Sequence, residues 1–534
     1  MKLAMGVYDS PQSQEQPIFY IDHMQSHIAV FGGPMSGKTT FIKTLLVRLH
    51  EDMTRIPKEN IYIIDFGGNL GHYGALGSVC ACFDNSNEEN IKRVFRTIET
   101  RLEENTRKLG SNSFYSLATK KPEECPTHLT LIIENINAFL ADERYASYQE
   151  RLMQFCRDGV SKGLTVVLTA NDVSGTGRLM ANFGQKIAFE MPSESYFEIF
   201  NTKVSKPMRI PGRCLVSPAT KRTVEGREDE AEAYVSDPAV YECQMFLPFE
   251  ELDDQACIET LIEQTAGFEN PYRMAAFGEA LTPENLTEYC TPEKLAAIGK
   301  DDVVVGLDYY EHSPVCINLN ENRSIAIYGK RKFGKTNLLT GMIDRIHSKL
   351  PETRFVYLDD GRNEVKALCE KHAATSVRLM NVLDFMGYLI DEGYVVKKYA
   401  PIRKESVALK ETPFTVFVLQ AKTFYSSQDS YNLLKWIAED MIGRAENSNY
   451  LFIFSDVRNI SDTEMRLRFN NLLSSAFLLD NIGEFVADRG NKSVFGEMDA
   501  RELKSEYAKC SVGDGYYYDI ETDVLKKLRF IKFL

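Results

Sequence analysis

Residues 27–40 read HIAVFGGPMSGKTT, and residues 324–337 read SIAIYGKRKFGKTN. In both stretches a short apolar run is followed by Gly, four further residues and Gly-Lys-Thr, and then by an amphipathic segment. The lysines of the two motifs, Lys38 and Lys335, lie 297 residues apart. Because this period is longer than a typical domain, the chain repeats a whole module.

The segments around the two motifs repeat as well. Continuous apolar runs occupy 61–68, 129–135 and 164–172 in the first half, and 355–361, 414–421 and 450–458 in the second. Such runs are typical of strands buried on both faces of a parallel sheet. Helical patterns alternate with them, beginning at 40–53 and 337–350. The sequence therefore predicts an α/β chain of two tandem P-loop NTPase (RecA-like) modules, each a mostly parallel sheet flanked by helices.

The predicted modules cover residues 1–250 and 296–534. Between them, residues 251–295 are polar and punctuated by proline, and we expect a linker or helical spacer there.

The composition excludes several classes of protein. The 534 residues carry a net charge of −14, which argues against broad DNA binding because that requires a surface rich in Lys and Arg. Neither an apolar run of membrane-spanning length nor a secretory signal is present, so we expect a soluble, cytoplasmic chain. The eleven cysteines include no CxxC and the eight histidines show no ligand spacing. We therefore expect reduced thiols and no metal site built by the chain alone.

Gly, four residues and Gly-Lys-Thr form the Walker A pattern. Its glycines let backbone N–H groups face phosphate oxygens at the start of a helix. Lys38 and Lys335 are expected to reach the β- and γ-phosphates of ATP, and the hydroxyls of Thr39 and Thr336 to bind Mg²⁺. The predicted nucleotide-binding residues are Gly32, Gly33, Pro34, Met35, Ser36, Gly37, Lys38, Thr39 and Thr40 in the first loop, and Gly329, Lys330, Arg331, Lys332, Phe333, Gly334, Lys335, Thr336 and Asn337 in the second.

The strands that should carry the Walker B carboxylates are degenerate. In the first module the run 131–133 is followed by Glu134 and Asn135; Glu134 can serve the metal, but Asn135 cannot act as a general base. In the second module Gln420 stands at this position, and neither carboxylate remains. Asp65 and Asp359 are excluded as replacements by chain order. The sequence predicts ATP binding with weak turnover, unless a catalytic Glu comes from elsewhere in the chain.

These features together resemble the FtsK/SpoIIIE superfamily. Each module opens with Gly, a spacer and Pro-Ile or Pro-Val, at Gly6 to Pro17-Ile18 and at Gly306 to Pro314-Val315. Asp65-Phe66-Gly67-Gly68, Gly163-Leu164 and Pro211-Gly212-Arg213 add to the likeness. The tandem layout, the degenerate Walker B strands and Gly513-Asp514-Gly515-Tyr516 are similar to the C-terminal half of the EssC/EccC-type ATPase of type VII secretion, over essentially the whole chain.

The resemblance implies a set of partners. Such proteins form hexamers, work with other secretion-machinery subunits and export small helical-hairpin WXG-type proteins. A hydrophobic groove in the last module would hold the signal tail of the substrate. Membrane helices and a further ATPase module, placed before this region, would hold the full-length protein at the cytoplasmic face of the cell membrane. No nucleic acid is expected.

The resemblance also implies roles for three further residues. Asn171 matches the sensor position after the fourth strand of the first module, and Ser455 is its weaker counterpart in the second. Arg157 lies where an inter-subunit arginine finger would lie, with a solvated helix-end charge as the alternative.

Three hypotheses for function follow. The first is a nucleotide-bound tandem that regulates a protein-secretion motor and recognises its substrate. The second is an FtsK-like DNA translocase, which would need intact Walker B pairs and a basic channel; the strand-like C-terminus ETDVLKKLRFIKFL offers no recognition domain. The third is a scaffold that binds no nucleotide, against which both intact Gly-Lys-Thr motifs argue. The aromatic run at 516–518 is expected to pack at the edge of a sheet.

Overall fold

A computed structural model of the chain describes residues 2–8, 16–51, 58–86, 88–217, 240–250, 254–264, 270, 272–274, 276–277, 280–359, 366–372, 376–392, 394, 414–420, 427–442, 449–455, 463–487, 494 and 510–533, without the side chains of 359, 368, 369, 420, 439, 440, 442 and 487. It divides into two compact units, Met1–Ala276 (unit 1) and Phe277–Leu534 (unit 2). The division falls inside the predicted spacer 251–295. None of the described helices is long and apolar enough to cross a membrane.

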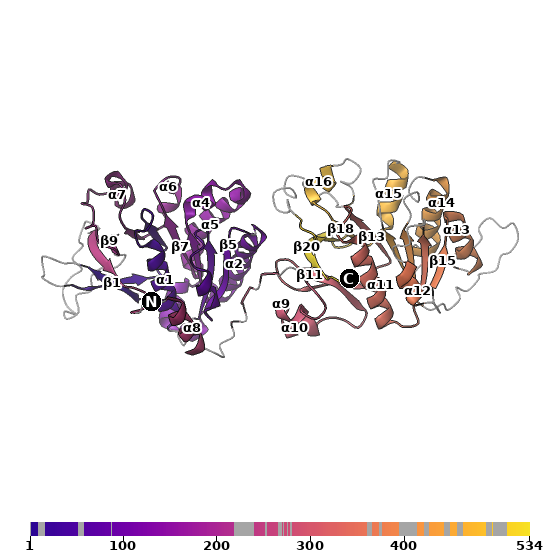
Figure 1. The fold of residues 1–534 in the computed structure, drawn as a ribbon, viewed down its shortest axis with the longest axis horizontal. Coiled ribbons are helices and arrows are strands. Elements are labelled where there is room, and N and C mark those ends of the chain that lie inside the picture. The colour runs from indigo at the N-terminus through magenta and orange to yellow at the C-terminus, as the bar shows by residue number, and fades with distance from the viewer. Residues whose placement is uncertain are drawn as a thin grey trace. The chain divides into compact units, whose positions relative to one another are not determined.

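Unit 1 is built on one ten-stranded sheet (Figure 1). In spatial order its strands are β2 (Ile18–Asp22), β1 (Lys2–Tyr8), β10 (Tyr241–Met245), β9 (Arg213–Ser217), β8 (Gln185–Ala188), β3 (Ile28–Phe31), β7 (Leu164–Ala170), β6 (His128–Glu134), β4 (Glu59–Asp65) and β5 (Val79–Asp84). The six strands from β8 to β5 are parallel, and the other four extend the sheet with antiparallel pairings.

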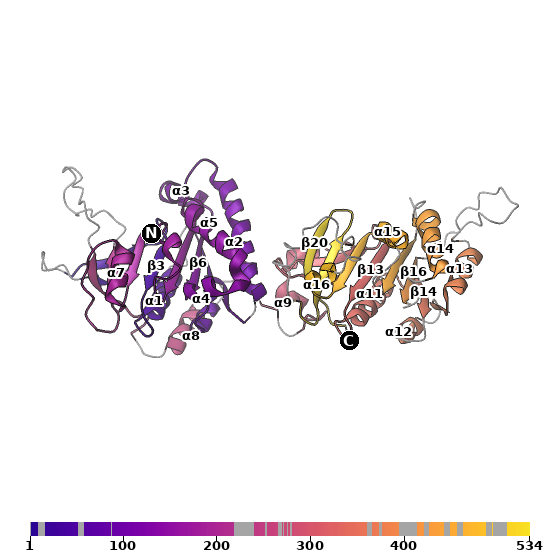
Figure 2. The same cartoon turned by 90° about the horizontal axis from the view of Figure 1, so that it is seen from above.

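Helices cover both faces of this sheet. They are α1 (Lys38–His50), α2 (Glu88–Leu109), α3 (Phe114–Lys120), α4 (Ile136–Ala141), α5 (Ala146–Lys162), α6 (Gly177–Met180), α7 (Ser193–Phe200) and α8 (Asp254–Gln264), with 3-10 turns at Gly71–Ala75, Pro122–Glu124 and Glu143–Tyr145. Figure 2 shows α2 and α5 on one side of the sheet and α1 and α8 on the other. Successive residues of β3 alternate between the two cores: Phe31 packs with α2 and α5, and Val30 packs with α1. Burial on both faces explains why this strand reads as an unbroken apolar run.

Unit 2 repeats the sheet with the same strand order. Its strands are β12 (Pro314–Asn318), β11 (Asp302–Asp308), β20 (Val524–Phe530), β19 (Asp514–Asp519), β18 (Ser475–Leu479), β13 (Ser324–Gly329), β17 (Tyr450–Ser455), β16 (Thr415–Gln420), β14 (Arg354–Asp359) and β15 (Ser376–Leu379). Its helices are α9 (Leu286–Tyr289), α10 (Pro292–Ala296), α11 (Lys335–Lys349), α12 (Lys366–Lys371), α13 (Val382–Asp391), α14 (Gln428–Trp436), α15 (Thr463–Leu472) and α16 (Ile482–Ala487), and a π-helical segment, Ile437–Ile442, follows α14. The predicted fold class is confirmed in both units.

The aromatic run at 516–518 packs as expected, but not at a sheet edge. It lies on β19, between β18 and β20, and all three tyrosines are buried. The edge placement was wrong because the antiparallel strands after the P-loop core add β19 and β20 inside the sheet, which the parallel pattern of the sequence does not show.

Candidate nucleotide-binding sites

The first P-loop connects β3 to α1 and is fixed to the strands beside it. The N–H of Gly32 donates to the carbonyl of Ala170 at the end of β7 (3.1 Å), and the N–H of Gly33 donates to the carbonyl of Glu190 beyond β8 (2.9 Å). Gly37 precedes the helix with a φ of 113°, which an L side chain rarely adopts. A Cβ at Gly32 would lie 2.3 Å from the Ser36 hydroxyl oxygen and 2.9 Å from the Cβ of Phe189, so a larger residue here would require its neighbours to shift.

Lys38, the lysine predicted to reach the phosphates, lies over this loop. Its ammonium donates to the carbonyls of Gly32 (2.6 Å) and Gly33 (2.8 Å), and the side chain is buried. Burial lowers the pKa of Lys38, and the nearby Glu134 carboxylate opposes this shift. A buried cation that holds only carbonyl oxygens is placed to exchange them for phosphate oxygens.

Glu134 and Thr39, the two predicted metal-binding groups of unit 1, lie side by side. The Thr39 hydroxyl donates to Glu134 Oε1 over 3.4 Å, while Oε2 is buried without a hydrogen-bond partner in the described chain. Burial raises the pKa of the Glu134 carboxyl, and the charge of Asp65 adds to the shift. A hydroxyl beside a carboxylate with an unused oxygen fits Mg²⁺, which binds through such groups together with the phosphates of its nucleotide.

The Asp65 carboxylate stabilises a turn and is not one of the predicted metal-binding groups. It accepts the backbone N–H groups of Gly67 (3.1 Å), Gly68 (2.8 Å) and Leu70 (2.7 Å) and so holds the turn after β4. This geometry agrees with its exclusion as the Walker B residue.

Asn135 and Asn171 are in contact, although they end different strands. The Nδ2 of Asn171 donates to Oδ1 of Asn135 over 3.3 Å. Asn135 is held with a φ of 63°, and its N–H donates to the Thr169 hydroxyl (2.8 Å). The predicted sensor therefore lies beside the Walker B end, but both side chains are amides, which cannot take a proton from water.

Ser455 is not the counterpart of Asn171. In unit 1 Val30 pairs with Thr169, and in unit 2 the equivalent Ile327 pairs with Ser455, so Ser455 corresponds to Thr169. The position equivalent to Asn171 is Val457, which lies outside the described residues. The prediction was wrong because strand ends cannot be aligned to within two residues from apolar runs alone.

The second P-loop repeats the backbone of the first. Lys332 has a φ of 71°, as its counterpart Met35 has a φ of 58°, and Gly334 precedes α11 with a φ of 107°. Lys335 donates to the carbonyls of Gly329 (2.6 Å) and Lys330 (3.1 Å).

Other contacts of the second loop differ. The ammonium of Lys330 forms ion pairs with Asp480 (3.2 Å) and Glu484. The side chain of Asn337, a predicted nucleotide contact, instead donates to the carbonyl of Ile531 (2.9 Å) and accepts the N–H of Phe533 (2.8 Å). Gln420 is opposite Asp359, just as Glu134 is opposite Asp65, so it occupies the Walker B position.

Arg157 lies away from the P-loop of its own unit. It is 68% exposed on α5 and pairs with Asp158 (3.3 Å). Its neighbour Cys156 accepts a hydrogen bond from His27, just before the start of β3, at the sheet edge opposite the loop. An arginine finger acting on another subunit remains a prediction.

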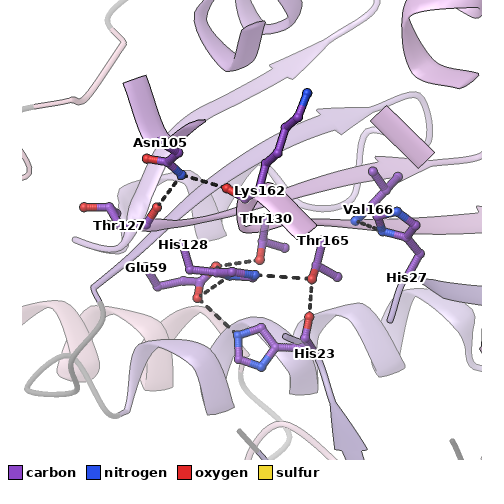
Figure 3. Close-up of polar contacts among 10 residues, drawn as sticks. All are labelled: His23, His27, Glu59, Asn105, Thr127, His128, Thr130, Lys162, Thr165 and Val166. Carbon is purple, nitrogen blue, oxygen red and sulfur yellow. Dashed lines mark hydrogen bonds and ion pairs between the residues drawn. The ribbon is translucent and has the colours of Figure 1, made fainter. Parts of the chain in front are cut away.

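The structure also assembles a polar group that sequence spacing did not show (Figure 3). The Glu59 carboxylate accepts from Nε2 of His23 (3.1 Å), Nδ1 of His128 (2.9 Å) and the Thr130 hydroxyl (2.5 Å). Both imidazoles are buried, and they hold the pKa of the Glu59 carboxyl well below its usual range against the effect of burial. The segments that carry these residues come together at the amino ends of β4 and β6, at the edge of the sheet opposite the P-loop. No motif in the sequence predicts that they are in contact.

The donor set His23, Glu59 and His128 resembles a zinc ligand set, because the three ligand atoms lie within 4.8 Å of one another. The hydrogen bonds favour ring protons on the two imidazoles over a metal ion between the three residues. A metal on Nε2 of neutral His23 would put the ring proton on Nδ1, which is buried and has no partner within the described structure. We therefore interpret these residues as a hydrogen-bonded network, called the Glu59 network below.

No protein-family model matches the chain. In sequence it is 24% identical over 392 residues to the ESX secretion system protein EccC of Thermomonospora curvata, covering 69% of this chain and 27% of that protein. It is 25% identical over 352 residues to the ESX secretion system protein YukB of Bacillus subtilis, covering 63% and 22%. The chain thus spans about a quarter of the length of these curated relatives.

Solved structures show the same fold. EssC (ATPases 2 and 3) from Geobacillus thermodenitrificans matches with a TM-score of 0.71 at 19% identity, covering 99% of this chain and 96% of that chain. Thermomonospora curvata EccC (ATPases 2 and 3), in complex with a signal sequence peptide, matches with a TM-score of 0.63 at 17% identity, covering 99% and 93%. The resemblance predicted from the motifs is confirmed: in sequence and fold, this chain is similar to the tandem ATPase modules of the EccC and EssC proteins of type VII secretion.

Proposed function

We propose that this chain is an ATP-binding tandem of a type VII protein-secretion ATPase, with weak or no hydrolysis of its own. The observation that carries the proposal is the repeated P-loop in which a lysine binds carbonyl oxygens of its own loop, at Lys38 and again at Lys335. A chain that binds no nucleotide has no physical need for two such cations.

Weak hydrolysis follows from the Walker B ends. When bound, Mg²⁺ would neutralise charge on the β- and γ-phosphates. Thr39 and Glu134 would hold it in unit 1. The next residue, Asn135, has no basicity with which to activate a water molecule, and in unit 2 Gln420 replaces the metal carboxylate itself.

The test is to denature the purified chain, extract the nucleotide and count it per chain. About two ATP per chain would support a tandem that binds and holds nucleotide. Bound ADP, or rapid turnover of added ATP that is lost in Lys38→Ala, would contradict the weak-hydrolysis part. Stimulation of that turnover by DNA would favour a translocase instead.

We also propose that the chain binds the signal peptide of a small secreted helical-hairpin protein through unit 2. Support comes from the EccC structure that contains a signal sequence peptide, and from exposed aliphatic side chains in unit 2. Leu383 on α13 and Leu467 on α15 are 62% and 53% exposed, and both helices pack against α14. A labelled peptide should bind the chain, and Leu383→Asp should weaken binding more than Val524→Asp on β20. Equal effects of the two variants would contradict the placement.

A further inference from the structure

The second P-loop carries three cations that the first lacks. Lys330, Arg331 and Lys332 stand where the first loop has Gly33, Pro34 and Met35, and all three are exposed. Because Lys332 and Met35 share the same left-handed backbone conformation, the two loops differ here in charge more than in shape.

The carboxylate that would hold Mg²⁺ is missing from the same unit. Gln420 replaces Glu134, and a neutral amide contributes no negative charge to a divalent cation. Asp480 and Glu484, the acidic side chains paired with this loop, bind the Lys330 ammonium. The unit 1 counterpart of Asp359 uses its carboxylate for three backbone N–H groups of a turn. Beyond the Thr336 hydroxyl, the described residues of unit 2 therefore do not fit the metal.

The two differences have opposite effects on charge. A nucleoside triphosphate is strongly anionic, and bound Mg²⁺ normally neutralises part of that charge. Arg331 and Lys332 form no ion pair within 4.0 Å in the part of the chain that the structure describes, so both cations face the loop's solvent side without a competing carboxylate. Side-chain cations that reach the phosphates from the loop can take over this neutralisation.

We infer that unit 2 binds a nucleoside triphosphate without Mg²⁺, through the cations of its P-loop, whereas unit 1 binds it as the Mg²⁺ complex. This inference rests on the proposed ATP binding and adds a metal requirement that separates the two sites. A site that binds without the metal also lacks the ion that would stabilise charge during phosphoryl transfer, so unit 2 would hold nucleotide and not turn it over.

Equilibrium dialysis of the full chain with labelled ATP, in Mg²⁺ or in EDTA, tests the inference. The expected count is about two ATP per chain in Mg²⁺ and about one in EDTA. The EDTA-resistant site should disappear in Lys335→Ala and remain in Lys38→Ala. Loss of all binding in EDTA, or a resistant site that depends on Lys38, overturns the inference but leaves ATP binding intact. No binding in Mg²⁺ means instead that the proposed function has failed.

Two double variants keep the test independent of Lys38 and Lys335. Arg331→Ala with Lys332→Ala should weaken binding in EDTA about tenfold or more and have a smaller effect in Mg²⁺. A control of equal charge removes two cations of α12 that pair with Glu370 and Asp344, Lys366→Ala with Lys371→Ala, and should leave ATP binding unchanged. The reciprocal variant Met35→Lys should make unit 1 less dependent on Mg²⁺. Equal losses in the first variant and in its control would refute the role of the loop cations.

Discussion

The Glu59 network offers the sharpest test of how unit 1 is stabilised. In Glu59→Gln the side-chain volume is kept, but one amide oxygen replaces two carboxylate oxygens that accept from three donors: His23, His128 and Thr130. The amide NH₂ would then face an imidazole N–H or the threonine hydroxyl. Each buried donor left unpaired costs about 1–3 kcal/mol, and more where a charge is removed. With at least one donor unpaired and the carboxylate charge lost, we expect unit 1 to lose about 2–4 kcal/mol of unfolding free energy.

The chain provides its own control for this experiment. Its single tryptophan, Trp436, lies at the end of α14 in unit 2, so tryptophan fluorescence during denaturation reports that unit. Hydrogen exchange of peptides from β4 and β6 reports unit 1. Glu59→Gln should accelerate exchange in these strands and leave the fluorescence midpoint in place, whereas Glu103→Gln, at an exposed position of α2, should change neither. A loss in unit 1 below about 1 kcal/mol would refute the reasoning, since three buried donors could not then depend on the carboxylate.

Four further predictions test individual groups. His27 accepts the Val166 N–H at Nδ1, and burial lowers its pKa from 6.5 to about 4. Because the unfolded chain then binds a proton at a higher pH than the folded chain, unit 1 should lose up to about 3 kcal/mol of unfolding free energy as the pH falls from 6.5 to 4. His27→Gln should flatten this pH profile in urea unfolding. Lys38→Ala should remove one of two ATP per chain and about half of any ATP-induced thermal shift; an unchanged count would place the first site elsewhere. Glu134→Gln should make ATP binding by unit 1 insensitive to added Mg²⁺ in calorimetric titrations, and a retained Mg²⁺ effect would show that another carboxylate holds the metal. Gly163→Ala should cost about 2 kcal/mol or more in denaturant unfolding, because Gly163 has a φ of 86° and its Cβ would lie 2.2 Å from the Phe114 ring; a neutral effect would mean that this ring can move away.

Local patterns were enough to predict the parts of the site that follow one strand. The run before Lys38 and the run before Glu134 each end where a parallel strand ends, and parallel strands bring their carboxyl ends to one edge. The contacts of Thr39 with Glu134, and of Asn135 with Asn171, follow from that rule.

Features that depend on segments far apart in the chain could not be predicted in this way. The Glu59 network joins a turn after β2 with the first residues of β4 and β6, and none of these positions shows ligand spacing. The ion pairs of Lys330 depend on where β18 ends, which requires the sheet order. The counterpart of Asn171 was placed two residues away because apolar runs do not fix strand register.

The antiparallel strands of each sheet have a consequence for how a chain gains further units by gene duplication. The opening strand β1 pairs with the late strand β10 in unit 1, and β11 pairs with β20 in unit 2. In unit 2 the first and last described segments are also neighbours, because Leu281 pairs with Ile531. Unit 1 instead ends beside β5, where the Met274 N–H donates to the carbonyl of Cys80. Unit 2 therefore has the arrangement in which domain insertion is well tolerated. A gene that duplicates such a unit, or inserts one into a longer reading frame, adds a complete sheet without opening the old one. Copies then become free to diverge separately, one keeping a metal carboxylate and another replacing it with charge on the loop.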